Sequence, residues 1–62
     1  MRATIEAQYD PERQTVTCTA TVYGQQYAAS MPAASPAEAH RILTLFADMY
    51  RELTYHVVVR AA

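Results

Sequence analysis

The chain has 62 residues, a formal net charge of −1 and one cysteine, so it has room for a single domain spanning residues 1–62 and cannot form an internal disulfide. Hydrophobic residues make up 52% of the chain and charged residues 18%, which indicates a globular protein, and no apolar run is long enough to cross a membrane. The basic residues are all arginines scattered along the chain, which disfavours nucleic acid as a partner without excluding it.

Two segments near the start alternate apolar and polar residues, which is typical of half-buried β-strands. They cover residues 3–9 and residues 15–23. The intervening residues 10–13, with aspartate first and proline second, suit a type I turn, because the proline ring presets the backbone angle that the turn needs. A four-residue loop at these positions pairs Tyr9 with Gln14 and predicts an antiparallel hairpin.

Residues 26–31 predict a third strand, joined to the second by a two-residue type II′ loop at Gly24 and Gln25. This loop pairs Val22 with Tyr27. Both loops place the apolar residues of all three strands on one face, whereas a slip of one residue would turn a strand over. The predicted buried face consists of Ala3, Ile5, Ala7, Tyr9, Val16, Cys18, Ala20, Val22, Tyr27, Ala29 and Met31.

A helix follows, from Pro36 to about Leu53. Ser35 as N-cap, Pro36 at the first helical position and Glu38 at the third form a capping box. Apolar residues recur at three- and four-residue steps, and we expect this stripe to cover the apolar face of the sheet. The stripe consists of Ala39, Ile42, Leu43, Phe46, Met49, Tyr50 and Leu53.

The segment from Thr54 to Ala61 alternates again and predicts a fourth strand. Since the helix reverses the chain, this strand should run parallel to the first and third strands. A right-handed crossover can set it beside either of them, and we expect the first. The predicted fold class is therefore α+β, with the order β-β-β-α-β: an antiparallel three-strand meander plus a fourth strand, and one helix packed on one face.

The sequence contains no recognisable catalytic constellation. Neither His40 nor His56 has a nucleophile or a carboxylate at a familiar spacing, and with Cys18 they lack the short spacing of a zinc site. Cys18 falls on the predicted buried face, where a thiol packs as a small apolar side chain. We therefore expect no enzyme, no cofactor and no metal.

The opposite face of the sheet is polar, nearly uncharged and carries a tyrosine, which resembles the composition of protein interfaces; a plain hydrated face is the alternative. An unpaired edge strand, extended by Leu45, Tyr50 and Tyr55, is a second option. The charge-poor face and the apolar run 57–59 also predict a homodimer. The residues predicted to bind a protein partner are Glu6, Thr17, Thr19, Thr21, Tyr23, Gln26, His56 and Val58.

Three segments carry a resemblance to known families: the hairpin at 23–26, the helix start at 35–38 and the terminal strand at 55–59. In layout and size, over the whole chain, the sequence resembles the small anti-CRISPR proteins of phages and mobile elements. This implies a non-enzymatic inhibitor or adaptor that binds a CRISPR-Cas effector complex in the cytoplasm of a host bacterium. The layout is also similar to the N-terminal domain of HicB-type antitoxins, which implies neutralisation of a toxin, although the glycine-rich strand turn of that family is missing. A nucleic-acid-binding module is a third alternative.

Overall fold

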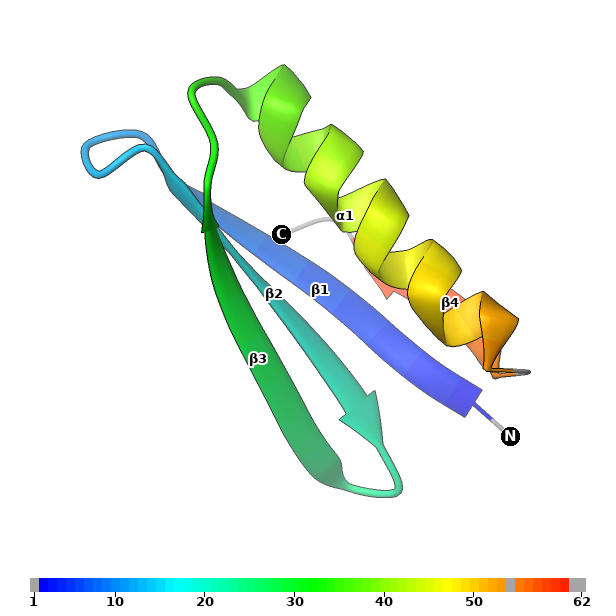
Figure 1. The fold of residues 1–62 in the computed structure, drawn as a ribbon. Coiled ribbons are helices and arrows are strands. Elements are labelled where there is room, and N and C mark those ends of the chain that lie inside the picture. Colours follow the sequence, from blue (N-terminus) through cyan, green and yellow to red (C-terminus); the bar gives the residue numbers. More distant parts are fainter. Residues whose placement is uncertain (1, 54, 61–62) are drawn as a thin grey trace.

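The computed structural model describes residues 2–53 and 55–60, so the predicted strand residues Thr54 and Ala61 lie outside the described part of the chain. A single sheet has the strand order β3-β2-β1-β4 and carries the helix on one face (Figure 1). This confirms the α+β class, and β4 pairs in parallel with β1, which confirms the expected position. The elements are β1 (Arg2–Asp10), β2 (Thr15–Val22), β3 (Gln25–Pro32), α1 (Pro36–Glu52) and β4 (His56–Arg60).

Asp10 shapes the first hairpin. Its Oδ1 accepts hydrogen bonds from the backbone N–H groups of Glu12 at 3.0 Å and Arg13 at 3.3 Å, which is how a short acidic side chain stabilises a turn. Gln14 closes the loop with a φ of 51°, in the left-handed region. The loop therefore covers residues 11–14, one position later than predicted.

The second hairpin turns at Tyr23 and Gly24, whose φ values are 52° and 74°. Two positive φ values are the mark of a type I′ turn, which suits the right-handed twist of the strands that it joins. The predicted type II′ loop at Gly24 and Gln25 is wrong, because the glycine takes the second loop position and Gln25 already pairs with Val22 in the ladder.

Both hairpin registers differ from the predicted ones by two residues. Ile5 pairs with Ala20 instead of Cys18, and Ala20 pairs with Tyr27 instead of Ala29. Side chains alternate with a period of two, so a shift of two residues leaves every side chain on its predicted face. The predicted cross-strand partners are therefore wrong, and the predicted strand faces are right.

The helix begins at the predicted capping box. Ser35 Oγ accepts a hydrogen bond from the backbone N–H of Glu38 at 3.2 Å. The Glu38 carboxylate accepts one from the N–H of Ala34, also at 3.2 Å, one residue before the N-cap that a capping box normally uses. Pro36 occupies the first helical turn, where its missing N–H costs no hydrogen bond.

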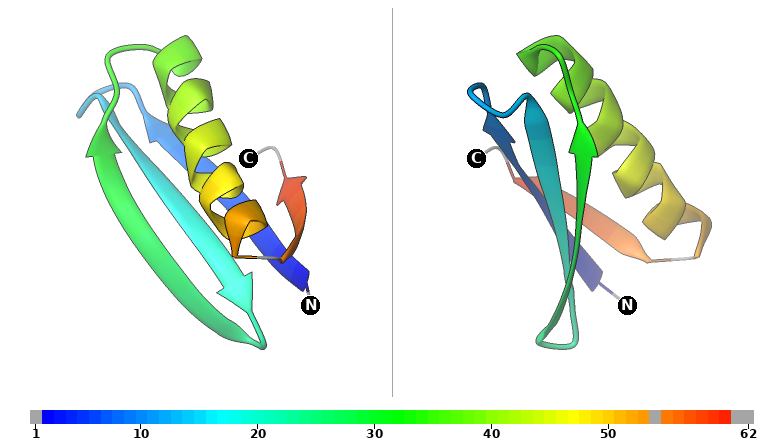
Figure 2. Two further views of the ribbon diagram at one scale, coloured as in Figure 1. Left: turned by 45° about the vertical axis from the view of Figure 1, so that its right-hand side comes forward. Right: turned by 60° about the vertical axis from the view of Figure 1, so that its left-hand side comes forward.

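The helix packs over β1, β2 and β4 and leaves β3 uncovered (Figure 2). Its buried residues are Ala39, Leu43 and Ala47, spaced by four. Ala47, 1% exposed, is missing from the predicted stripe, whereas the predicted stripe residues Met49 and Leu53 are 53% and 61% exposed. That part of the stripe prediction is wrong, because the helix presents its small residues to the sheet. The described residues contain no helix long and apolar enough to cross a membrane.

Candidate protein-binding surface

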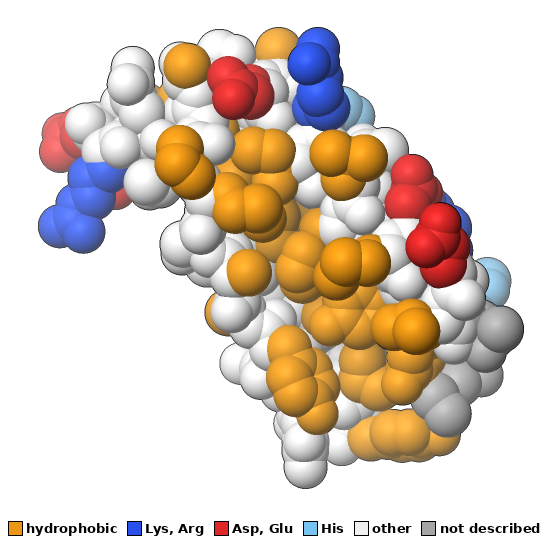
Figure 3. All heavy atoms as spheres, in the orientation of Figure 1, with side chains coloured by type: hydrophobic (Ala, Val, Ile, Leu, Met, Phe, Trp, Pro, Cys, Tyr) orange, Lys and Arg blue, Asp and Glu red, His pale blue; other side chains and the backbone are white. Residues whose placement is uncertain are grey.

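An apolar groove runs between β3 and α1. It has a volume of about 310 Å³, and we call it the β3–α1 groove. It forms because the helix lies to one side of the sheet, so most of the face of β3 that was predicted to be buried stays open: Tyr27 and Ala29 are exposed, and Met31 is half-buried. Figure 3 shows hydrophobic side chains gathered in a band along this side, with charged side chains at its margins. The groove is lined by Ala29, Met31, Ile42, Leu45, Phe46 and Met49.

Beside the groove, toward the C-terminal end of the helix, lies a second hollow that is rich in tyrosine. Tyr50 lies between two other rings, with centroid distances of 5.4 Å to Phe46 and 5.9 Å to Tyr55. Tyr27 donates its hydroxyl hydrogen to Gln25 Oε1 at 2.9 Å, which leaves its ring available for apolar contact. This tyrosine hollow is lined by Val22, Tyr23, Gln25, Tyr27, Tyr50, Leu53 and Tyr55.

The exposed side chains of this surface are large. Leu45 is 63% exposed, Met49 53% and Tyr27 53%. Burying a side chain of this size fully contributes about 1.5–3 kcal/mol, so covering several of them at once would drive association. Among the described residues that line the groove and the tyrosine hollow, no side chain is charged. Contiguous apolar surface of this kind marks interaction sites in soluble proteins.

The backbone of β3 adds unpaired hydrogen-bonding groups to the same side. A two-residue turn closes on a hydrogen-bonded pair, here Val22 with Gln25, so the odd-numbered residues of β3 bond to β2. The N–H of Ala33, which donates to the carbonyl of Gln14 at 2.9 Å, continues this pattern. The N–H groups of Gln26, Ala28 and Ser30 therefore point away from the sheet, at its open edge.

The outer face of the sheet brings together five of the residues predicted from the sequence to bind a partner. Thr17 also bonds to Ser30 on β3, at 2.9 Å between the two hydroxyl oxygens. No described helix or strand covers this face, on which the threonines are half-buried and the other two residues exposed. The five residues, which share a shallow hollow, are Glu6, Thr17, Thr19, Thr21 and Gln26.

The other three predicted residues lie apart from that hollow. His56 and Val58 are on β4, opposite Arg2 and Thr4, so they share the outer face but are separated from β2 by the width of β1. Tyr23, 78% exposed, is a turn residue and lines the tyrosine hollow. Its predicted place on the outer face is wrong, because the turn starts one residue earlier than expected.

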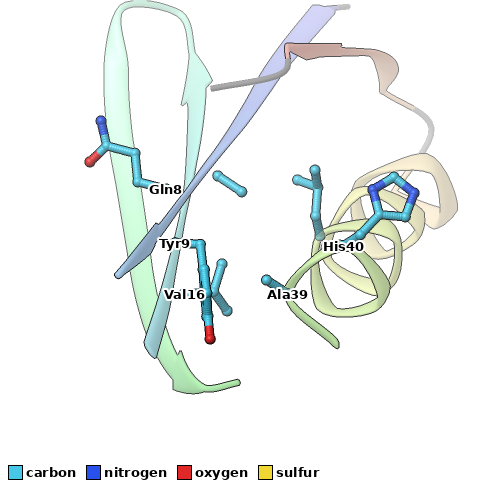
Figure 4. A pocket seen from close by; sticks show the side chains of 7 residues that line it. Gln8, Tyr9, Val16, Ala39 and His40 are labelled. Carbon is cyan, nitrogen blue, oxygen red and sulfur yellow. The ribbon is translucent and has the colours of Figure 1, made fainter. Parts of the chain in front are cut away.

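A further hollow, of about 600 Å³, lies between the end of β1 and the start of the helix (Figure 4). Among its described lining residues, only Tyr9 and His40 are ionisable, and they come from opposite walls. Gln8 points to the far side of the sheet in the same view. The lining residues that the structure describes supply no nucleophile beside a base, and the hollow is widely open to solvent.

Cys18 and the metal-binding side chains suggest no further site. Cys18 is fully buried, and its burial raises the pKa of the thiol, which keeps it neutral and weakly nucleophilic. Within residues 2–53 and 55–60, no three metal-binding side chains gather at one place. The thiol packs with Val16 and Ala39 as an ordinary core residue.

Sequence reasoning anticipated Leu45 at the helix margin but not the groove itself. A usable signal was present: the apolar residues Leu43, Leu45, Phe46 and Met49 spread over more of the helix circumference than one packed face requires. The excess indicates a side of the helix that needs another partner. No family model, curated protein or solved structure matches the chain, so the inference about function rests on the chemistry of this surface.

Proposed function

We propose that this chain is a non-catalytic protein-binding module whose binding surface is the β3–α1 groove together with the tyrosine hollow and the open edge of β3. The observation that supports this is the exposure of Leu45 and Met49 beside the uncovered face of β3. When a chain adds to an open strand edge, backbone hydrogen bonds contribute affinity, and side-chain contacts along the groove contribute specificity. The outer face, with Thr17, Thr19 and Thr21, is the rival surface predicted from the sequence.

Site-specific photo-crosslinking tests which surface binds. A photoreactive phenylalanine analogue in place of Leu45 should crosslink to a discrete protein in the cells that make the chain. The same analogue at Thr44, the preceding helix residue and also exposed, or at Thr19 on the outer face, should not crosslink. Replacing Met49 by glutamate should remove the crosslink from position 45, since a charge in the groove opposes apolar contact.

The outcomes separate the two surfaces. Crosslinking from Thr19 but not from Leu45 would place binding on the outer face and contradict the proposal. Equal crosslinking from Leu45 and Thr44 would mean that the contacts at the groove are not specific.

More specifically, we propose that the chain is an inhibitor that binds a CRISPR-Cas effector complex. Its small size and its layout of strands and helix support this. Expressing the chain in a bacterium whose CRISPR system targets a phage should then restore plaque formation. The Leu45→Asp variant should lose this effect, because it places a charge in the groove, and Thr44→Asp should keep it. Undiminished immunity in every system tested would remove the inhibitor form and leave the binding module in place.

A further inference from the structure

Except for Pro32 at its end, the strand β3 lacks the protection that natural edges usually have. Lysine residues, short length or bulges normally prevent edges from pairing with other chains. β3 is eight residues long and has no charged side chain, and its ladder with β2 runs without interruption. At the other edge, β4 has only five residues and carries Arg60. β3 is therefore the edge that is free to extend the sheet.

We propose that a second copy of this chain pairs with this edge, β3 against β3, antiparallel about a two-fold axis at Ala28. This inference rests on the proposed function, in which this side of the molecule is the binding surface. It concerns the strand edge, and it differs from the outer-face dimer predicted from the sequence.

The backbone geometry satisfies such a pairing. An axis at Ala28 sets each Ala28 opposite the other and each Gln26 opposite Ser30 of the second copy. Every outward N–H of these residues then faces an outward carbonyl, as in an ordinary antiparallel ladder. Pro32, which has no N–H, falls at an outward position at the end of the strand, where edge strands tolerate proline.

The side chains fit the same symmetry. A charged group close to a two-fold axis lies near its own copy, so a self-pairing edge should be uncharged at its centre, and β3 is uncharged throughout. On the groove side, the pairing sets Tyr27, 53% exposed, opposite the small Ala29 of the second copy. On both sides of the axis, the large Tyr27 of one copy then lies beside the small Ala29 of the other and covers part of the exposed groove side of β3.

A second copy suits this edge better than an unrelated chain, because the domain needs support wherever it is present. Among residues 2–53 and 55–60, the largest fully buried side chains are only Ile5, Val16 and Cys18. Domains of this size commonly depend on disulfides, metals or oligomerisation, and a second copy accompanies the chain under all conditions. Pairing would also set the two β3–α1 grooves side by side, as one wider trough open to a partner protein.

Sedimentation of the full-length chain over a concentration series tests the pairing. The wild type should behave as a dimer at high micromolar concentration. Ala28→Lys and Ala28→Glu should each raise the dissociation constant about tenfold, because like charges then meet across the axis. An equimolar mixture of the two variants should restore the dimer. Thr19→Lys adds the same charge on the same face, one strand further in, and should leave the dimer intact.

Each result has a defined meaning. A monomeric wild type, or a dimer that Ala28→Lys does not weaken, overturns the pairing, provided that circular dichroism shows folded protein. Failure of the mixture to recover the dimer overturns the position of the axis. A monomer that still crosslinks from position 45 to a protein of another mass would refute the dimer and leave the proposed function standing.

Discussion

Replacing Ala47 by aspartate is expected to unfold the domain. Ala47 is 1% exposed and lies in an apolar cluster with Ile5 and Leu43. An unpaired carboxylate buried there would cost several kcal/mol, which is comparable with the whole stability of a domain of this size. Far-ultraviolet circular dichroism and the dispersion of amide resonances should both show loss of the folded state at 25 °C.

Leu45→Asp is the matched control. It makes the same kind of change on the same helix, two residues away, at a side chain that is 63% exposed. Its helix-propensity cost is similar, so a difference between the variants reports burial. Leu45→Asp should fold with a melting temperature near that of the wild type. If both variants unfold, or both fold, the helix does not face the sheet in the way that the structure shows.

The strand faces were predictable because they depend on parity alone. The alternation around Ile5 and Cys18 decides which side chains point to the helix, and any even shift of register preserves that choice. The turn at Tyr23 was not predictable with the same rules. A tyrosine rarely takes a positive φ, so the sequence favoured starting the loop at Gly24, yet the tertiary structure places the left-handed conformation on Tyr23 as well.

Which side of the helix packs on the sheet depends on how closely the helix can approach the strands. A hydrophobicity pattern does not contain that distance. By size and hydrophobicity, Met49 is a better core candidate than Ala47 in the sequence. In the structure, however, Ala47 packs with Ala3 and Ala20 of the sheet, which allows the helix to lie close to the strands. The bulky residues then fall to the flanks of the contact. Small residues on both partners are the physical reason why the predicted stripe was centred wrongly.

The groove follows from the widths of a four-stranded sheet and of one helix, which could be expected from the predicted elements. Four strands spaced ~4.8 Å apart span roughly 15 Å between the outer strand axes, whereas a helix with its side chains is only ~10 Å wide. One helix therefore covers part of a four-stranded sheet, and a strand must remain open. Which strand remains open depends on the crossover to β4, which draws the helix toward β1 and away from β3.

Truncating Ile5 to alanine is expected to cost about 2–5 kcal/mol, the range for deleting a large buried aliphatic side chain. Ile5 is fully buried and is the largest of the fully buried side chains, in the middle of a small cluster that has few other atoms to collapse into the cavity. Ile5→Val removes one methylene and should cost only about 0.5–1.5 kcal/mol. Urea denaturation followed by circular dichroism measures both; equal costs for the two variants would contradict a close-packed core at this position.

The same variants connect the core to the proposed pairing at β3. If folding and pairing are coupled, the apparent stability of Ile5→Val rises with protein concentration, because a dimer binds only the folded state. Adding Ala28→Lys to Ile5→Val should abolish that dependence without changing the stability at high dilution, since residue 28 is exposed and lies on the opposite face of the sheet from the cluster around Ile5. A stability of Ile5→Val that is independent of concentration would mean that the domain is held together by its small core alone.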